Sequence, residues 1–534
     1  MELSRRAFIG GASCAGAAAI LAGLTGCGQK ANDGGGASGG DADSSSKNEF
    51  EQRQTLAPEV ARTLTCEILV AGGGISGLSA AVEAAQKGAS VILLEKASDV
   101  GGNSNGAEGP FAVESPMQQE AGIELTLYDA ILNELEFSNY RTNTQIWTNF
   151  LRRSGEDIQW LMENGVKFVD VRTTNDGLMG WHYYDGGGKS AVAAMKATAE
   201  SLGVTIMTST PLTGLILDSG ICKGAYAADT DGNTIAVDAA AVILATGGTG
   251  ANTAILSERT GFDCSKATIN CSPGDTGDAI EAVSALDAQT RTACIMGDKC
   301  VYGFQMFDHI SFATTRQPNL WVNGHGERFV NEGIVRENIP CTFNALFLGQ
   351  DCAYSILDQA TVDRYAAGDL PDKITNYFPD QPSELANLKD QIEQSLNSGL
   401  GVAFKGDSVA ELATAMGIDA DVLAKTVKEY NAVCSAGRDT DFYKKAEYLS
   451  PVEAGPFYAF RFDPLVVCAI GGIETDDANR VLKTDGTPVP NVFAVGLDGC
   501  NLYEETYNMT LSGSCNGYCV YSGRNAADNA LVLL

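Results

Sequence analysis

Hydrophobic and polar positions follow two different periods near the start of the folded part of the chain. Residues Glu67–Ala71 form a short β-branched and aliphatic run that predicts a strand, and Ser90–Leu94 form a second run of this kind. Between them, Ser76–Lys87 has helical spacing and many small residues. The order strand, helix, strand predicts a parallel βαβ unit.

Glycines occupy the junction between the first strand and the helix. Gly72, Gly74 and Gly77 form a GxGxxG pattern, and Glu95 ends the second strand. Gly72 allows a tight turn, Gly74 lets the backbone approach a pyrophosphate at the helix N-terminus, and Gly77 lets the helix pack closely on the strand. Glu95 would accept hydrogen bonds from an adenosine ribose. These residues together predict a dinucleotide site.

A second glycine-rich turn lies much later in the chain. The apolar run Ala241–Leu244 predicts another buried strand, which leads into Thr246, Gly247 and Gly248. A further glycine-rich segment, Gly101–Ser104, follows Glu95 closely. Several such features serving one cofactor fit a long flavin dinucleotide better than NAD.

Length and charge limit the remaining classes. A chain of 534 residues with 44% apolar and 19% charged residues is typical of a globular protein of two or three domains. The net charge of −31 repels phosphate backbones, so nucleic acid is not expected as a partner.

Residues 1–27 resemble an export signal. The twin arginine Arg5–Arg6 precedes the small, apolar run Gly10–Gly26, which is short for a membrane-spanning helix, and Leu24–Cys27 resembles a lipoprotein cleavage box. We therefore expect export by the twin-arginine route to the outer face of the cytoplasmic membrane or the cell envelope, with Cys27 as a candidate lipid anchor. Residues 28–62 have almost no apolar side chains and predict a flexible linker.

Five motifs in chain order carry a resemblance to the FAD-dependent fumarate reductase and succinate dehydrogenase flavoproteins, with their flavocytochrome c and ketosteroid dehydrogenase relatives. The motifs are Ala245–Gly248, Gly274–Asp278, GERFVNE at Gly326–Glu332, Gly471–Gly472 and Val492–Gly496. The resemblance implies an α/β fold in which a Rossmann-like FAD-binding domain, residues 63–294 and 467–534, holds an inserted α+β capping domain, residues 295–466.

The resemblance also implies how the cofactor is held. Beyond the first glycines and Glu95, it assigns FAD contacts to Gly102, Asn103, Ser104, Thr246, Gly247, Gly248, Asp278, Asp498 and Ser514. Relatives with covalent flavin carry a His after the GGNS-like segment, whereas this chain has Asn105–Gly109, so FAD should be non-covalent. Because the haems of the flavocytochromes are absent from the sequence, electrons should come from a membrane-anchored cytochrome or a quinol-oxidising partner.

Arg336 is the candidate proton donor implied by the resemblance. In relatives that reduce fumarate, flavin N5 passes a hydride to one alkene carbon and an arginine five residues beyond the Asn of the GxRFxNE motif protonates the other; here Asn331 leads to Arg336. Arg316 is a candidate relay arginine. The alternative is that Arg336 only forms an ion pair with Glu332 or Glu337.

Two departures from the family pattern affect the substrate. The segment Val466–Gly472 lacks the carboxylate-binding His, and Tyr507–Ser514 lacks the second carboxylate-binding Arg. Instead Val466, Val467, Met509 and two tyrosines surround the expected site. Tyr503 and Tyr507 could donate hydrogen bonds to a carbonyl oxygen, or they could only pack the cap against the flavin domain.

The sequence therefore predicts an exported ene-reductase of anaerobic electron transport. Its substrate would be a bulky, neutral α,β-unsaturated carbonyl, such as an enone or an unsaturated lactone of cardiac-glycoside or steroid type. The alternatives are a ketosteroid dehydrogenase, a fumarate-type carboxylate reductase and a non-enzymatic electron-transfer flavoprotein.

The fifteen cysteines leave one further question open. No CxxC occurs, but distant thiolates could meet around a [4Fe–4S] cluster. Cys468 and Cys500 fall at turns on the flavin side, and Cys515 and Cys519 are one helical turn apart, so these four are the candidate ligands. The alternative is that they are free, buried thiols.

Overall fold

The computed structural model describes residues 58–173, 177–291, 294–301, 308–337, 346, 352–371, 385–504 and 506–534, and gives the backbone alone for residues 294, 296, 298–300, 336 and 337. The predicted export signal, the linker up to residue 57 and the side chain of Arg336 lie outside this description. Residues Glu59–Leu534 form one compact unit. None of the helices within the described ranges is long and apolar enough to cross a membrane.

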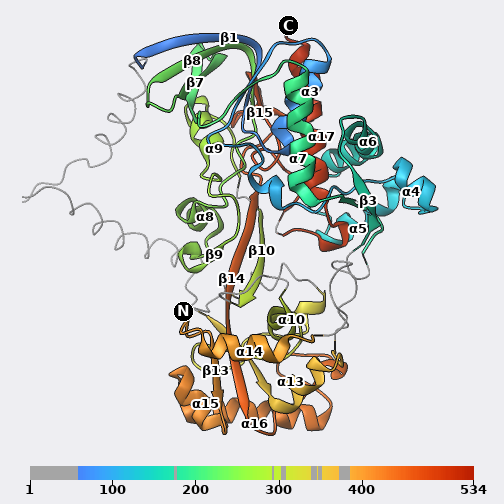
Figure 1. Cartoon of the computed structure of the whole chain (residues 1–534), viewed down its shortest axis with the longest axis vertical. Coiled ribbons are helices and arrows are strands. Elements are labelled where there is room, and N and C mark those ends of the chain that lie inside the picture. Colours follow the sequence, from blue (N-terminus) through green and yellow to red (C-terminus); the bar gives the residue numbers. More distant parts are fainter. Residues whose placement is uncertain are drawn as a thin grey trace, which may run out of the picture. The chain divides into compact units, whose positions relative to one another are not determined.

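A mostly parallel sheet forms the centre of the first part of this unit (Figure 1). Its main strands, in the spatial order β15–β16–β8–β1–β2–β5, are Arg480–Leu482, Pro488–Ala494, Thr234–Leu244, Val60–Ala71, Val91–Leu94 and Thr205–Met207. All neighbours except β15 and β16 pair in parallel. The sheet continues from β8 into the antiparallel strands β7 (Ile221–Ala228) and β6 (Leu212–Asp218).

Strand β1 is longer than the sequence pattern predicts. It begins at Val60, inside the predicted linker, because Val60–Cys66 pair with Thr234–Ala239 of β8. The residues before Glu67 are largely exposed, so this extension has no hydrophobic pattern of its own and is held by backbone hydrogen bonds to β8.

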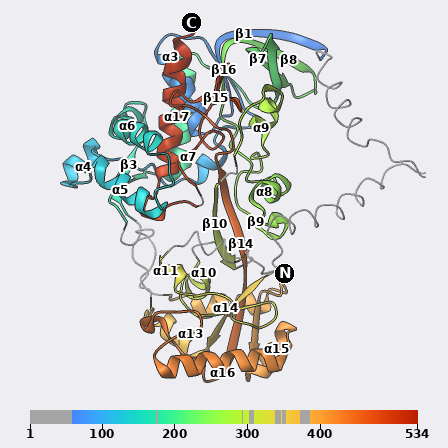
Figure 2. The ribbon, with the colours of Figure 1, turned by 180° about the vertical axis from the view of Figure 1, so that it is seen from behind.

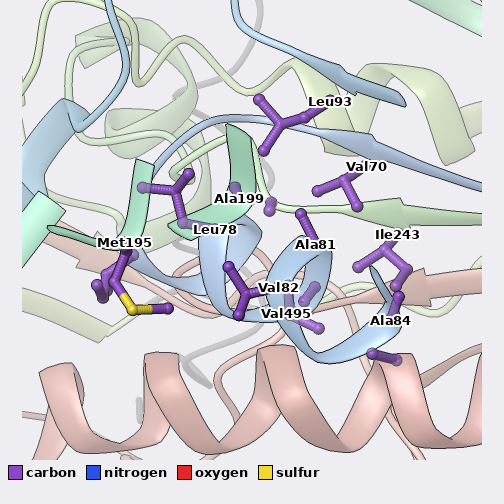
Figure 3. Close-up of a cluster of buried hydrophobic side chains, with 14 of the residues drawn as sticks. Val70, Leu78, Ala81, Val82, Ala84, Leu93, Met195, Ala199, Ile243 and Val495 are labelled. Carbon is purple, nitrogen blue, oxygen red and sulfur yellow. The ribbon is translucent and has the colours of Figure 1, made fainter. Parts of the chain in front are cut away.

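Three helices pack on one face of the parallel sheet: α3 (Ile75–Gln86), α7 (Gly187–Ser201) and α17 (Ser514–Leu531) (Figure 1). Small residues let α3 and α17 approach closely, since a Cβ atom added at Gly523 would lie 2.2 Å from the Ser76 carbonyl oxygen. Figure 3 shows the core that these helices share with the sheet, including Val70, Leu78, Ala81, Val82, Ala84, Leu93, Met195, Ala199, Ile243 and Val495.

Two excursions complete the first part. The first follows the 3₁₀ turn η1 (Gly102–Gly106) and contains α4 (Pro116–Ala121), α5 (Leu127–Phe137), α6 (Thr144–Glu163), β3 (Phe168–Arg172) and β4 (Trp181–Tyr184). The second follows β8 and contains α8 (Thr253–Thr260), η2 (Cys264–Lys266), β9 (Thr268–Ile269), α9 (Asp278–Val283) and η3 (Ser284–Leu286).

A second sheet lies mostly within residues 295–466, the predicted inserted region. Its strands are β10 (Cys294–Val301), β14 (Phe457–Ile470), β12 (Ala353–Asp358) and β11 (Leu320–Asn323) in this spatial order, with β13 (Ala403–Gly406) and β9 also on β14. The described helical segments around it are α10 (His309–Thr315), α11 (Ile334–Glu337), α13 (Gln359–Ala366), α14 (Leu388–Asn397), α15 (Val409–Met416), α16 (Ala420–Ala436) and η4 (Ala446–Tyr448) (Figure 2).

The long strand β14 belongs to both parts. Its first half pairs with β12 and β13, whereas Leu465–Ile470 pair with β9 and the start of β10 (Figure 1). A last 3₁₀ turn, η5 (Met509–Leu511), precedes α17. The parallel sheet with its helices and the mixed inserted region confirm the predicted α/β fold class.

Candidate active site

A cavity of about 400 Å³ lies at the carboxyl ends of the central parallel strands. Ala71, Leu94 and Ala245, at or just beyond the ends of β1, β2 and β8, line it, and Cys515 at the start of α17 lines it as well. In open α/β sheets, ligands bind at this edge. The cavity therefore lies where the sequence predicts a dinucleotide.

The three fingerprint glycines have different surroundings. Gly72 has φ +112°, and a Cβ there would lie 2.0 Å from the Ala245 carbonyl oxygen. A Cβ at Gly77 would lie 1.9 Å from the Gly72 carbonyl oxygen, so these two positions exclude a side chain because of the protein itself. A Cβ at Gly74 would meet no atom nearer than Ser104 Oγ at 3.6 Å, and Gly74 lines the cavity. The open space at Gly74 is where a pyrophosphate would approach the start of α3.

Glu95 lines the cavity and is held by backbone groups. Its carboxylate oxygens accept hydrogen bonds from Gly73 N at 2.8 Å and from Ala97 N at 2.7 Å. A carboxylate has roughly four acceptor sites, so two remain for hydroxyl groups of a ligand. The arrangement fits the predicted ribose contact.

The GGNS segment connects the start of α3 to the second excursion. Ser104 Oγ accepts a hydrogen bond from Ile75 N at 2.9 Å, and Asn103 bonds both Asp275 Oδ2 and Ser272 N at 2.5 Å. Gly102, Asn103 and Ser104 all line the cavity.

Asp498 holds the second glycine-rich turn through hydrogen bonds. Its carboxylate accepts hydrogen bonds from the backbone N–H groups of Thr246 and Gly248 and from the Thr246 hydroxyl. Burial raises the pKa of Asp498 to about 6. Thr246 and Gly247 line the cavity, whereas Gly248 and Asp498 do not. Of the predicted FAD contacts, Asp498 is thus placed to shape the turn.

Two other aspartates line the cavity. Asp278 forms an ion pair with Lys96 at 2.8 Å. Asp275 is buried, and burial raises its pKa to about 8, with the nearby charges of Asp498 and Glu95 acting in the same direction. A protonated Asp275 could donate a hydrogen bond to a ligand as well as accept one.

The amino terminus of α17 also lies at the cavity. The N-cap residue Gly513 has φ +86°, and Gly513, Cys515 and Asn516 line the cavity, whereas the buried Ser514 does not. The positive end of a helix dipole stabilises negative charge, such as that of a reduced flavin ring. With open space at Gly74, two free acceptor sites on Glu95 and a helix terminus in the cavity wall, the residues present fit FAD.

Arg316 reaches the cavity from the inserted region. It is the C-cap of α10, is 5% exposed and lines the cavity together with Val467 and Met509. Arg336 lies in α11, but its side chain is outside the described part of the chain. The structure thus places one of the two predicted arginines at the cavity.

The two predicted tyrosines differ in their exposure to the cavity. Tyr507 lines it; its hydroxyl accepts a hydrogen bond from Gly513 N at 2.7 Å, lies 3.4 Å from the Leu511 carbonyl oxygen and also bonds Ser514. Tyr503 does not line the cavity, and its hydroxyl lies 2.7 Å from Ser514 Oγ. Tyr503 packs against the rings of Trp147 and Tyr507, which both lie outside the predicted capping domain.

Glu108 is a cavity residue that the sequence analysis did not assign. It lines the cavity near Trp181, whose indole N–H donates to the Gly109 carbonyl at 3.0 Å. Burial raises the pKa of Glu108 to about 7, and within the described residues its carboxyl is bonded only to its own backbone N–H. The pattern that could have predicted this residue is a carboxylate among small residues directly after the GGNS segment.

Three of the four predicted cluster cysteines lie together. The Cys515 thiol shares hydrogen bonds with the thiols of Cys500 and Cys519; the bond with Cys500 and burial hold its pKa well above the usual range, although the bond with Cys519 lowers it. Cys468, Cys515 and Cys519 line the cavity. Within the described residues, no group of three or more His, Cys, Asp or Glu side chains is arranged to hold a metal ion.

Comparison with known proteins gives consistent relatives. The FAD binding domain family matches residues 67–512. The vinyl phenol reductase of Lactiplantibacillus plantarum is 35% identical over 475 residues, which cover 87% of this chain and 96% of that protein. The urocanate reductase of Eggerthella lenta is 27% identical, with 92% of this chain and 79% of that protein covered.

Solved structures share the fold. The open conformation of a flavocytochrome c3 fumarate reductase has a TM-score of 0.68 at 22% identity, covering 93% of this chain and 82% of that one. The 3-ketosteroid-Δ4-(5α)-dehydrogenase of Rhodococcus jostii has a TM-score of 0.64 at 23% identity, covering 90% of this chain and 98% of that one. With the cavity described above, the family match identifies this chain as a member of the FAD binding domain family and as an FAD-dependent oxidoreductase that acts on C=C bonds of unsaturated substrates.

Proposed function

We propose that the chain is an exported ene-reductase that reduces the activated C=C bond of a bulky, neutral α,β-unsaturated carbonyl. The substrate class is an enone or an unsaturated lactone of cardiac-glycoside or steroid type. Bound FAD would supply a hydride from N5, and Arg336 would supply the proton to the other alkene carbon.

The composition of the cavity's substrate end carries this proposal. Val467, Met509, Tyr507 and Trp181 give it an apolar and aromatic lining beside Arg316. Among the described lining residues, the only other cation is Lys96, which is paired with Asp278. A dicarboxylate needs charged or hydrogen-bonding partners at both ends, so this lining favours a neutral substrate.

The two arginines have separate roles in the proposal. A guanidinium normally keeps its proton, so Arg336 can act as an acid only if neighbouring groups replace the proton that it gives away. Arg316 is buried beside the cavity and is the proposed relay arginine. Its burial supports this role because exclusion of water strengthens the coupling between charged neighbours.

Tyr507 is the proposed hydrogen-bond donor to the substrate carbonyl. Its contact with the Leu511 carbonyl oxygen is 3.4 Å, longer than the usual 2.5–3.0 Å of an O–H···O hydrogen bond. A carbonyl oxygen that gains negative charge as hydride arrives would therefore compete well for this proton.

A second substrate class is favoured by one specific relative. The vinyl phenol reductase, 35% identical to this chain, reduces an alkene conjugated with a phenol ring according to its name. The buried Glu108 carboxyl could accept a hydrogen bond from such a hydroxyl group. A phenolic alkene is therefore our second candidate.

Cellular location and electron supply are also part of the proposal. The twin arginine Arg5–Arg6 supports export, and Cys27 supports lipid anchoring at the outer face of the cytoplasmic membrane or in the cell envelope. A membrane-anchored cytochrome or a quinol-oxidising partner would deliver the electrons.

A [4Fe–4S] cluster remains a prediction attached to the same proposal. The contact of the Cys515 thiol with Cys500 and Cys519 supports it, but the described side chains do not form a metal site. Iron and labile sulfide analysis of anaerobically purified protein would decide it: four irons and four sulfides per chain would support the cluster, and none would leave buried thiols.

The test of the function uses the full chain with FAD and reduced viologen under anaerobic conditions. Enones, unsaturated lactones, 4-vinylphenol and fumarate are offered in turn. Viologen oxidation with the neutral carbonyls supports the proposal, and a preference for 4-vinylphenol supports the second candidate. If fumarate is the best substrate, or if only dye reduction by a saturated ketosteroid is seen, the proposal is wrong.

The proton donor is tested in the same assay. Arg336→Ala should lower kcat by roughly 10²–10⁴-fold because general acid catalysis is lost, while FAD stays bound. The matched control is Arg438→Ala, which removes an exposed arginine from the inserted region and should leave kcat unchanged. An electron-transfer flavoprotein without a substrate site would show the same activity in both variants.

A further inference from the structure

The GERFVNE motif forms a buried ion cluster inside the inserted region. Arg328 donates to both carboxylate oxygens of Glu332, at 2.8 and 2.7 Å, and to Asp439 at 2.7 Å. Lys444 Nζ lies 3.5 Å from Glu332. The side chains of Glu332, Asp439 and Lys444 are fully buried, and that of Arg328 is 8% exposed. Two carboxylates and two cations give the cluster zero net charge.

Lys444 links this cluster to the segment that follows Arg316. Its Nζ donates to the Asn319 carbonyl oxygen at 3.3 Å and to the Tyr430 hydroxyl at 2.8 Å. The Asn319 side chain in turn donates to the carbonyls of Ala313 and Thr314, at 2.8 and 3.3 Å, which are the last turn of α10. Arg316 is the C-cap of α10. Two hydrogen bonds, through Asn319, therefore connect Lys444 to the helix that ends at Arg316.

Glu332 links the same cluster to the helix that carries Arg336. Its carbonyl accepts the hydrogen bond from Val335 N at 3.3 Å, which lies in the first turn of α11. Its carboxylate also accepts from Trp321 N, in β11, at 3.2 Å. Glu332 therefore holds the start of α11 against β11, the strand between α10 and α11 in the chain.

We propose that Lys444 is a positioning residue: through Glu332 and Asn319 it holds α10 and α11 in one fixed relation, so that Arg316 and Arg336 are oriented together for proton transfer. The role of the arginines in this inference rests on the proposed function. The structural link itself does not.

The geometry distinguishes this role from simple charge balance. Arg328 already pairs with both Glu332 and Asp439 through three short hydrogen bonds, and burial holds the pKa of Lys444 below its usual range despite the Glu332 charge. A buried lysine is costly where an arginine already pairs both carboxylates. What Lys444 adds is the connection to Asn319 and Tyr430 on other elements.

Two variants of the FAD-loaded full chain test the proposal. Lys444→Met keeps an unbranched side chain one atom shorter and removes its donors. kcat per bound FAD should fall about ten- to a hundredfold, with a small change in KM, because misplacement of reacting groups by about 1 Å costs this much. Glu332→Gln with Lys444→Met restores charge balance without the link, so kcat should stay low. Lys405→Met, at an exposed lysine that lies over the Tyr458 ring, is the control.

Amide hydrogen exchange gives a readout that does not require turnover. Lys444→Met should raise exchange in His309–Thr315 and Ile334–Glu337 while leaving α17 protected. If the double variant recovers wild-type kcat, or if exchange in these two segments is unchanged, the proposal is wrong. If the unmodified protein reduces no alkene, the proposed function fails and the exchange result alone decides the structural link.

Discussion

At Gly77 a single methyl group has no space. An added Cβ would lie 1.9 Å from the Gly72 carbonyl oxygen and 3.3 Å from the Ala245 side chain. Helix α3 could accept it only by moving away from β1, and the pyrophosphate-binding turn lies between these two elements. Gly77 itself does not line the cavity, so a side chain there would act on it through the position of α3.

We therefore expect Gly77→Ala to lower both stability and FAD content. Overpacking of this kind costs about 1–3 kcal/mol in the free energy of unfolding. The measurements are thermal unfolding and the ratio of flavin to protein absorbance after purification. The control is Gly214→Ala in β6, where an added Cβ meets no atom within 4 Å. Equal FAD content in the two variants would contradict this expectation.

The sequence predicts some site residues well because their role depends on backbone spacing. Gly72, Gly74 and Glu95 line the cavity. A glycine fingerprint between a strand and a helix allows essentially one backbone conformation, which fixes where these residues lie. The side chains of Asp498 and Ser514 instead face the protein, where they bond Thr246 and Tyr503. Whether a side chain points into a cavity depends on tertiary packing, which also explains why Glu108 was not assigned.

At the scale of elements, the junction between α5 and η5 contains a buried carboxyl. Glu134 in α5 is 1% exposed and accepts a hydrogen bond from the Asn508 side chain at 2.9 Å. Burial raises the pKa of Glu134 to about 8. Met509 in η5 lines the cavity, and Asn508 is the N-cap of η5. The charge state of Glu134, which bonds Asn508, therefore affects the part of the cavity wall that η5 forms.

The pH dependence of stability follows from this raised pKa. A carboxyl whose pKa is higher in the folded state than in the unfolded state binds more protons when folded, so its stabilising contribution is full below about pH 4.5 and is lost as pH rises to about 8. Glu134→Gln keeps the hydrogen-bond acceptor and cannot ionise. Relative to this variant, the unmodified protein should lose up to about 1.4 kcal/mol in the free energy of unfolding per pH unit in that window. Urea unfolding at pH 5, 6.5 and 8 measures the difference, and a constant difference would contradict the assignment.

Elements with clear periodicity were predictable, and those held by long-range pairing were not. The strand and helix around the fingerprint appear as expected, because burial on both faces leaves continuous apolar runs. The first residues of β1 and the 14-residue β14 are held by partners far away in the sequence. Such strands have no local pattern that fixes their ends.

At the scale of the whole molecule, the attachment of the cofactor can be tested directly. The segment Asn105–Gly109 offers no histidine to flavin, so we expect FAD to be non-covalent. Acid precipitation of the holoprotein should leave the yellow colour in the supernatant, whereas colour in the pellet would show a covalent bond. Added FAD should also raise Tm, since a ligand at about 100 times its Kd stabilises the folded state by roughly 2.7 kcal/mol.

The pairing of β10 with β14 has a consequence for the length of chain that can lie between these two strands. The chain enters the predicted inserted region along β10 and leaves it along β14, with paired residues from Cys294–Ile470 at one end to Val301–Phe462 at the other. Exit and re-entry are therefore one strand spacing, about 4.8 Å, apart. A short hairpin turn would join the same two points, so a longer or shorter chain between β10 and β14 fits the same pair of strand ends.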